Sequence, residues 1–411
     1  MTRRPSSEPT DRHELVRRAN VELVFRAIGD HGPISKPDLV RLTGLSKPTV
    51  LGLVAALEDE GLIRPRPIRR TGAVGRAPMV YEHDPGAAHV IGIDVGGTKI
   101  SAGIADLAGN LMEEVETGTT TAGGQAVIDQ LVEVARGLAR RTGVPWSKVD
   151  AVSIGTPGVL AADGTLGLAQ NVTGLGAVPV LVELRRALRT TVVLENDVNM
   201  AVIGELEAGV AASCRTFALL AIGTGVGAGL VIDGRLVRGA NGAAGEVAYL
   251  PIGGDPTTAD ARVRGTLEVA IAGSGVQALI ASELGRRRAN HSALDITSTA
   301  RDAYELAAAG DAVARRVVAR HAELVARAVL SLVSVIDPEL VVVGGGIGSN
   351  PLLLPPLRAE LARLASWPVR VETSALGARA GLIGAIHHAR RSIPQIESDR
   401  VSVRLQTGAG S

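Results

Sequence analysis

The sequence predicts an α/β protein in which an N-terminal winged helix-turn-helix precedes a two-lobed body. Three observations predict this fold class. Three helical stretches and a basic hairpin occupy residues 13–82. A unit of strand, glycine-rich turn and strand occurs near residue 89 and again near residue 217. Long Ala/Leu/Arg helices follow, and a chain of 411 residues is expected to form two or three domains.

Composition and charge narrow the classes of function. Apolar residues make up 46% of the chain, which excludes intrinsic disorder for most of it. Residues 1–80 hold 14 Lys/Arg against 9 Asp/Glu, a net charge of +5, whereas the remainder carries a net charge of −4. A basic N-terminal segment on an acidic body favours a polyanion as the partner of that segment.

The single cysteine, Cys214, excludes an internal disulfide and a cysteine-rich zinc site. The early arginines are not followed by the apolar core of a signal peptide, and no apolar run approaches the roughly 18 residues of a membrane span. We therefore expect a soluble, cytoplasmic protein that has no membrane partner.

The N-terminal segment has the pattern of a helix-turn-helix. Apolar residues at helical spacing predict a helix over residues 13–29 and a short helix over residues 36–43. A glycine-containing turn follows, and Ser46 suits the N-cap of a third helix over residues 47–60. Strands at 62–64 and 79–81, on either side of an arginine-rich turn, predict the wing.

This module is expected to bind double-stranded DNA, because the basic hairpin favours that function over a helical packing or dimerisation module. The third helix of such a motif enters the major groove, and phosphate contacts outnumber base contacts. For Ser46, capping is preferred over contact with a phosphate. The candidate DNA-binding residues are Ser46, Lys47 and Thr49 on the helix and Arg70 and Arg76 on the wing.

Glycine-rich turns dominate the body. Residues 96–98 and 223–225 connect paired strands, and a third cluster at 344–346 follows the apolar strand 340–343. Glycine turns allow peptide N–H groups to approach phosphate oxygens, although hairpins also need glycine for their own sake. None of the three has the spacing of a P-loop or of a Rossmann fingerprint. The repetition favours a nucleotide held between two lobes.

A possible ligand residue follows another strand. Asp197 comes directly after the apolar segment 192–194, and ligands collect at the carboxyl ends of strands in open α/β sheets. Asp is also a good helix N-cap, so a purely structural role is the alternative.

Together these segments resemble the ROK family (repressors, open reading frames, kinases) of the actin-like ATPase superfamily. The resemblance covers nearly the whole chain and implies a two-lobed, sugar kinase-like body. It rests on residues 94–99 (DVGGTK), 195–197 (END), 223–229 (GTGVGAG), 242–246 (GAAGE) and 344–346 (GGG).

The resemblance implies ATP and Mg as cofactors if kinase activity is retained. The nucleotide-binding residues that it implies are Asp94, Gly96, Gly97, Thr98, Lys99, Gly223, Thr224, Gly225, Gly344 and Gly345.

The resemblance also implies a sugar site, in which Asp197 is the catalytic base that takes the hydroxyl proton. The implied sugar-binding residues are Asn171, Asn196, Asp197, Glu246 and Glu268. The alternatives are a turn residue for Asn171, a solvated side chain for Glu246 and a helix-surface position for Glu268.

The sequence departs from the family's structural zinc site. The histidine position is Tyr249, and the three cysteine positions are Ala259, Ala261 and Thr266. The chain is therefore expected to bind no zinc and to have no metal site of its own. Either the loop from about residue 251 to 264 is loosened, or Tyr249 packs into the vacated space and restores order.

We interpret the chain as a DNA-binding transcriptional regulator, expected to be a repressor of carbohydrate genes, that acts as a homodimer or dimer of dimers and is controlled by a sugar or sugar phosphate. The rival is an active ATP-dependent, glucokinase-like sugar kinase with a DNA-binding module, and a third possibility is a body that binds a protein partner. The expected parts are a flexible N-terminus (1–12), the winged helix (13–82), the kinase-like domain (88–391) and a polar tail (392–411).

Overall fold

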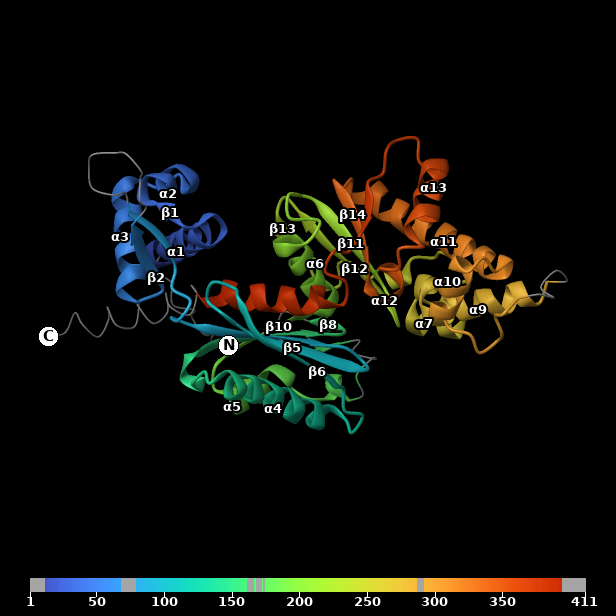
Figure 1. Ribbon diagram of the computed structural model, residues 1–411, viewed down its shortest axis with the longest axis horizontal. Coiled ribbons are helices and arrows are strands. Elements are labelled where there is room, and N and C mark those ends of the chain that lie inside the picture. The colour runs from blue at the N-terminus through green and yellow to red at the C-terminus, as the bar shows by residue number, and fades with distance from the viewer. Residues whose placement is uncertain are drawn as a thin grey trace, which may run out of the picture.

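The computed structural model describes residues 12–67, 79–160, 166–167, 172, 174–286 and 292–393. The winged helix stands at one end of the molecule, and the two lobes of the body lie beside each other (Figure 1). The long helix over residues 380–393 lies on the first lobe and reaches toward the winged helix.

The winged helix forms as the sequence predicts. Gly44 adopts a left-handed φ of 68° in the turn, and the Ser46 side chain accepts from Thr49 N–H at the start of the third helix, so the predicted cap is confirmed. A short strand, β1, was not expected; it joins the wing in a three-stranded sheet of order β1-β3-β2. The elements are α1 (Arg12–His31), β1 (Ile34–Ser35), α2 (Lys36–Thr43), α3 (Lys47–Asp59), β2 (Ile63–Pro67) and β3 (Met79–His83).

The first lobe is a five-stranded sheet of order β10-β7-β4-β5-β6. Helices α4 (Gly124–Thr142) and α5 (Val180–Leu188) cover one face, and the helix over residues 380–393 covers the other (Figure 1). The strands are β4 (His89–Val95), β5 (Lys99–Asp106), β6 (Leu111–Gly118), β7 (Val149–Thr156) and β10 (Thr191–Asn196). Short elements between them are η1 (Trp146–Lys148), β8 (Val159–Leu160), β9 (Leu166–Gly167) and η2 (Leu175–Ala177).

The second lobe is a five-stranded sheet of order β13-β12-β11-β14-β15. Its strands are β11 (Phe217–Ile222), β12 (Val226–Ile232), β13 (Arg235–Leu236), β14 (Leu340–Gly344) and β15 (Val371–Thr373). Its helices are α6 (Asp197–Ala208), η3 (Val247–Tyr249), α7 (Ala259–Arg264), α8 (Thr266–Ile271), α9 (Gly273–Leu284), α10 (Ala300–Ala308), α11 (Ala312–Ile336), α12 (Gly345–Gly348), α13 (Leu354–Leu364) and η4 (Gly377–Arg379).

The two sheets have one topology. In the first lobe β4 pairs antiparallel with β5 and parallel with β7, and in the second β11 pairs antiparallel with β12 and parallel with β14. The repeated strand–turn–strand units therefore open two equivalent lobes. The predicted α/β class, with a winged helix before a two-lobed actin-like body, is confirmed.

The winged helix is docked on the body. One hydrophobic cluster contains Phe25 and Ile28 of α1 together with Leu382, Ile386 and Ala389 of the helix over residues 380–393. A polar tail is expected from residue 392 onward. The helix over residues 380–393 nevertheless continues through residue 393, and the side chain of Ile393 is buried.

Within the described ranges, no single helix is long and apolar enough to cross a membrane. The pair α2 and α3 passes that test of length and composition together, with a bend of 118° between the two helices.

Candidate functional site

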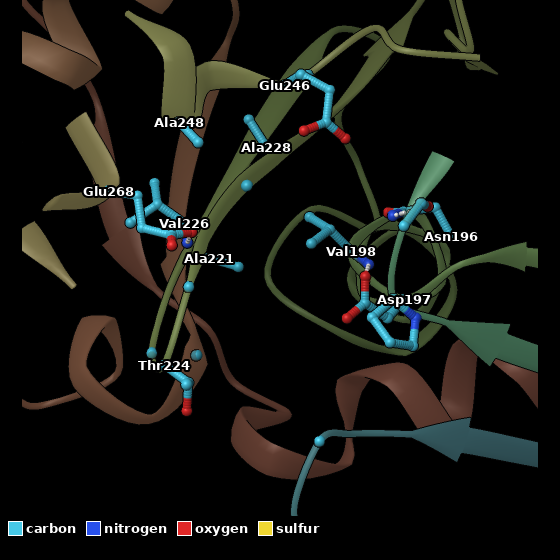
Figure 2. Close-up of a pocket in the computed structure, with 18 of the residues that line it drawn as sticks. Asn196, Asp197, Val198, Ala221, Thr224, Val226, Ala228, Glu246, Ala248 and Glu268 are labelled. Atoms are coloured by element: carbon cyan, nitrogen blue, oxygen red, sulfur yellow. Dashed lines mark hydrogen bonds between the residues drawn. The ribbon is translucent and has the colours of Figure 1, made fainter. Parts of the chain in front are cut away.

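A cleft of about 500 Å³ lies between the two lobes. Both hairpin turns line it, residues 96–98 from the first lobe and 223–225 from the second. Figure 2 shows Asn196 and Asp197 on one side of the cleft, Val226 and Glu268 on the other, and Glu246 near its upper rim. The cleft thus brings together segments that are far apart in the sequence.

The residues predicted to bind nucleotide gather mostly at this cleft. Asp94 and Gly344 stand behind it, on the strands that lead into the turns. Gly345 has a φ of +80°, and a Cβ there would overlap the backbone of Ile222, so this close approach requires glycine. Lys99 Nζ lies 2.7 Å from Glu116 Oε2. The members that line the cleft are Gly96, Gly97, Thr98, Lys99, Gly223, Thr224, Gly225 and Gly345.

The beginning of α6 supplies the polar floor of the cleft. Asn196 is the N-cap: its Oδ1 accepts from Asn199 N–H at 3.1 Å, and its Nδ2 donates to Gly158 O at 3.0 Å. Asp197 is therefore the first helical residue, and the alternative prediction that it caps the helix is wrong. Its Oδ1 accepts from the N–H of Val198 at 2.8 Å, and the residue lines the cleft.

Several carboxylates share this confined space. Burial raises the pKa of Asp197 to about 6, with Glu246 adding to the rise and the N–H of Val198 opposing it. Burial and the charge of Asp197 raise the pKa of Asp94 to about 7, against the opposing charge of Lys99. Burial and Glu268 raise the pKa of Glu246. These carboxylates offer oxygens that can accept hydrogen bonds from the hydroxyl groups of a ligand.

The residues that line the cleft indicate how ATP and Mg²⁺ could be held there. Among the residues that the structure describes, no cluster of three or more His, Cys, Asp or Glu side chains is arranged to hold a metal ion. A Mg²⁺ ion bound in the cleft would therefore take most of its oxygen ligands from nucleotide phosphates and water, as Mg²⁺ usually does. The two glycine turns line the cleft from opposite lobes, where phosphates could approach the backbone because glycine has no Cβ.

Glu268 is held from two directions. Its Oε2 accepts from Val226 N–H at 3.1 Å, and its Oε1 lies 3.2 Å from Nε of Arg264. Arg264 also donates from Nη2 to Ser274 Oγ at 2.8 Å and lies 3.5 Å from Asp260. Sequence reasoning missed Arg264. The only available signal was its position four residues before Glu268.

The positions that correspond, by the resemblance, to the family's zinc ligands hold other side chains. The hydroxyl of Tyr249 donates to Val263 O at 3.0 Å, and residues 259–264 form α7, capped by Thr258. Tyr249 remains 44% exposed, so it ties the loop by a hydrogen bond and does not fill a vacated space. The buried side chains of Ala261 and Thr266 pack at two of the cysteine positions.

A buried carboxylate behind the cleft was also missed. Glu195 accepts from Asn196 N–H and from Asn199 Nδ2, both at 2.9 Å, and from Arg238 Nε at 2.7 Å. It therefore fixes both the end of β10 and the first turn of α6. Its position beside Asn196 in the sequence was the available signal.

Of the candidate DNA-binding residues, the structure describes the three on the helix, Ser46, Lys47 and Thr49. Lys47 is exposed at the first position of α3, and Thr49 is partly exposed two residues later. The Ser46 hydroxyl lies 2.7 Å from that of Thr49, which agrees with the capping role. Arg70 and Arg76 on the wing and Asn171 of the sugar set lie outside the described residues.

Known proteins resemble both parts of the chain. A family model described as "ROK family" matches residues 90–392, and one described as "MarR family" matches residues 23–73. A glucokinase from Halalkalibacterium halodurans is 31% identical over 311 residues, covering 72% of this chain and 92% of that protein. A xylose repressor from Caldicellulosiruptor bescii is 26% identical over 385 residues, covering 91% and 96%.

Solved structures agree on the architecture. A ROK family transcriptional regulator, described as a homolog of the E. coli MLC protein, superposes with a TM-score of 0.78 at 20% identity, covering 93% of this chain and 98% of that one. At that identity the likeness concerns the fold. A ROK family glucokinase from Streptomyces griseus, in complex with glucose and AMPPNP, has a TM-score of 0.61 at 26% identity and covers 74% and 100%.

Proposed function

The chain belongs to the ROK family, and from this premise we propose that it is a transcriptional repressor of carbohydrate genes whose DNA binding is controlled by a sugar or sugar phosphate in the cleft. The observation that carries the proposal is the length of the match to the xylose repressor, which includes the winged helix and covers 91% of this chain. The glucokinase match covers 72%.

The winged helix supplies the DNA-binding half of the function. Lys47 is exposed at the N-terminal end of α3, the end by which recognition helices enter the major groove, and the exposed face of α3 continues with Leu51 and small residues. Such a face can read little beyond methyl groups and a few acceptors, so affinity would come largely from phosphate contacts. A homodimer would place two winged helices on two half-sites.

The cleft supplies the sensing half. Asp197, Glu246 and Glu268 offer carboxylate oxygens from three different segments, and sugar hydroxyls are donors that such oxygens accept. The raised pKa values of Asp197 and Glu246 reflect charge buried without enough partners. Hydroxyl donors from a sugar would relieve that deficit, which favours a polyhydroxylated ligand.

The test starts from the DNA, because the operator has to be found. Fragments of the source genome retained by the immobilised full-length chain are sequenced, and binding to the best fragment is measured with D-glucose, D-xylose and their phosphates. At least one compound should weaken or strengthen DNA binding at millimolar concentration or below. If no fragment is enriched, or no sugar changes the binding, the proposal fails.

A second candidate function is an ATP-dependent sugar kinase. The ROK family includes sugar kinases. Two observations favour kinase activity here: the glycine-rich turns at 96–98 and 223–225 both line the cleft, and the Asp197 carboxylate points into it. An assay of ADP release with each hexose, repeated with Asp197→Asn, separates the two functions. We expect turnover to be slow or absent, because Arg264 and Tyr249 replace the family's zinc-fixed scaffold and small misplacements are costly in rate.

A further inference from the structure

Helix α6 joins the cleft to the neighbourhood of the winged helix. Its first residue, Asp197, lines the cleft. In its last turn Glu207 pairs with Arg391, and its Oε2 lies 3.3 Å from Nδ1 of His387. Both partners belong to the helix over residues 380–393. Helix α6 therefore begins in the cleft and ends against the helix over residues 380–393, on which the winged helix packs.

The two helices cross with their backbones in contact. A Cβ on Gly204 of α6 would overlap the carbonyl oxygen of Ala380, and a Cβ on Gly384 would overlap that of Met200. Figure 1 shows α6 close to the long C-terminal helix. At these two glycines, backbone meets backbone, so a shift there is not absorbed by a change of rotamer. A displacement of one helix is therefore passed to the other, as in other close-packed interiors.

A second connection joins α6 to the same helix. Glu205 is fully buried, and its Oε1 accepts from Leu376 N–H at 3.1 Å and from the hydroxyl of Ser374. Its Oε2 accepts from Val210 N–H at 2.9 Å. The segment that leads into residues 380–393 is thus bound to the last turn of α6.

The winged helix packs directly on this pair. Arg26 and Asp30 of α1 line one small cavity together with Glu207, His387 and Arg391. On the apolar side, residues of α1 share a hydrophobic cluster with the helix over residues 380–393. Any movement of that helix changes contacts on which the orientation of α1 depends.

We propose that α6 and the helix over residues 380–393 form a coupled pair that transmits occupancy of the cleft to the winged helix. This inference rests on the proposed function and names its regulatory path. It is argued from a continuous series of contacts: Asp197 begins α6, α6 meets residues 380–393 at Gly204, Gly384 and Glu207, and residues 380–393 pack against α1. By linkage, a sugar that changes the affinity for DNA by some factor must have its own affinity changed by DNA by the same factor.

The main test removes the charge of Glu207 in the last turn of α6, which pairs with Arg391, and leaves the residues of the cleft unchanged. Glu207→Gln is compared with Glu360→Gln, which removes an equal charge from the remote, exposed Glu360–Arg363 pair of α13. The coupling factor is the DNA dissociation constant with saturating D-xylose or D-glucose divided by that without it. We expect a factor of about 5–150 in the unaltered protein and in Glu360→Gln, and at least threefold less coupling in Glu207→Gln, with sugar and DNA each still bound.

An unchanged coupling factor in Glu207→Gln overturns the inference and leaves the proposed function standing. A ligand-free measurement tests the connection even if no sugar acts. Hydrogen exchange of Asp197→Asn, with Asp233→Asn on the exposed β12–β13 turn as control, should change protection in residues 380–393 and in α1 but not in α13. Changes confined to the first turn of α6 and the cleft would contradict the coupling.

Discussion

Arg264 reaches Glu268 across the break between two short helices, with Nε 3.2 Å from Oε1. Gly265, whose φ is +93°, separates α7 from α8 between them. A guanidinium thus anchors the carboxylate on the wall of the cleft, in the segment where other members of the family place zinc ligands.

Arg264→Ala should weaken sugar binding. Glu268 would lose the guanidinium that fixes Oε1 and keep the N–H of Val226 on Oε2. The bond is lost in the free protein as well as in the complex, so we expect the dissociation constant to rise roughly fivefold, the lower end of the effect of a lost hydrogen bond. Calorimetric titration with the sugar that affects DNA binding measures the change. Arg262→Ala, on the exposed face of the same short helix, is the control. Equal affinities in the two variants would exclude this role.

The purified protein should hold no stoichiometric zinc. Cys214 is the only cysteine of the chain, and it is buried away from Tyr249, which occupies the family's histidine position. Metal analysis after dialysis against a chelator should find well under one zinc per chain. The thermal midpoint should be the same before and after the treatment. One zinc per chain that resists the chelator would refute the expectation.

Sugar affinity should depend on pH through Asp197. Its pKa is raised to about 6, so its carboxylate is largely ionised at pH 7.5 and largely protonated at pH 5. Protonation replaces a charged acceptor of hydroxyl groups by a weaker neutral one, so affinity should fall as the pH drops through 6. Titrations at both pH values, repeated with Asp197→Asn, measure the effect. The variant should show a smaller change with pH; an identical profile would place the titrating group elsewhere.

His321 should make the protein sensitive to acid. It is fully buried, accepts from the hydroxyl of Tyr304 and donates to Ile271 O, both at 2.8 Å. Burial lowers its pKa from 6.5 to about 4. The unfolded chain therefore binds more protons between these values, and stability falls as pH falls, by about 2 kcal/mol from pH 7 to pH 5 for this group.

Urea unfolding of the unaltered protein and of His321→Gln at pH 7 and pH 5 isolates that contribution. The raised pKa values of Asp94 and Asp197 act in the opposite direction, but they cancel in the difference between the two proteins. His31→Gln, at an exposed position of α1, is the control. If the variant lost as much stability on acidification as the parent, His321 would not be the acid-sensitive group.

Lys47→Ala should weaken DNA binding and reduce its salt dependence. If Lys47 contacts one phosphate, the slope of log K against log salt should fall by about 0.9, because one counterion fewer is released. Lys148→Ala removes the same charge from an exposed position of the body and should leave the slope unchanged. Removal of residues 1–80 should abolish binding. Retention of DNA by that shortened chain would locate the DNA site in the body.

Local patterns made much of the fold predictable. Both β hairpins combine β-branched residues with a glycine turn, and both formed within a few residues of the expected limits. The choice between Asn196 and Asp197 as helix cap was not predictable in this way. Either residue can cap, and the outcome depends on the pairing of β10 with β7, which continues through Asn196.

Long-range partners explain most of what was missed. The helix over residues 380–393 has a modest apolar pattern, and its packing partners lie more than 170 residues away, in α6 and α1. From the sequence alone, Arg264 is expected to be a solvated charge. In the fold it contacts Glu268 of α8 and Ser274 of α9. Such roles arise only when distant segments meet, and a local apolar pattern does not say which segments these are.

The docking of the winged helix on residues 380–393 has a practical consequence for chimeric regulators. A transplant of residues 1–82 alone would separate Phe25 and Ile28 from Leu382 and Ile386 and leave apolar surface exposed on both pieces. The transferable unit is therefore discontinuous: it consists of the N-terminal module and the late helix on which that module rests. Chimeras that exchange both segments together should keep their ligand response. Those that exchange only the first segment should bind DNA, but the sugar should no longer change that binding.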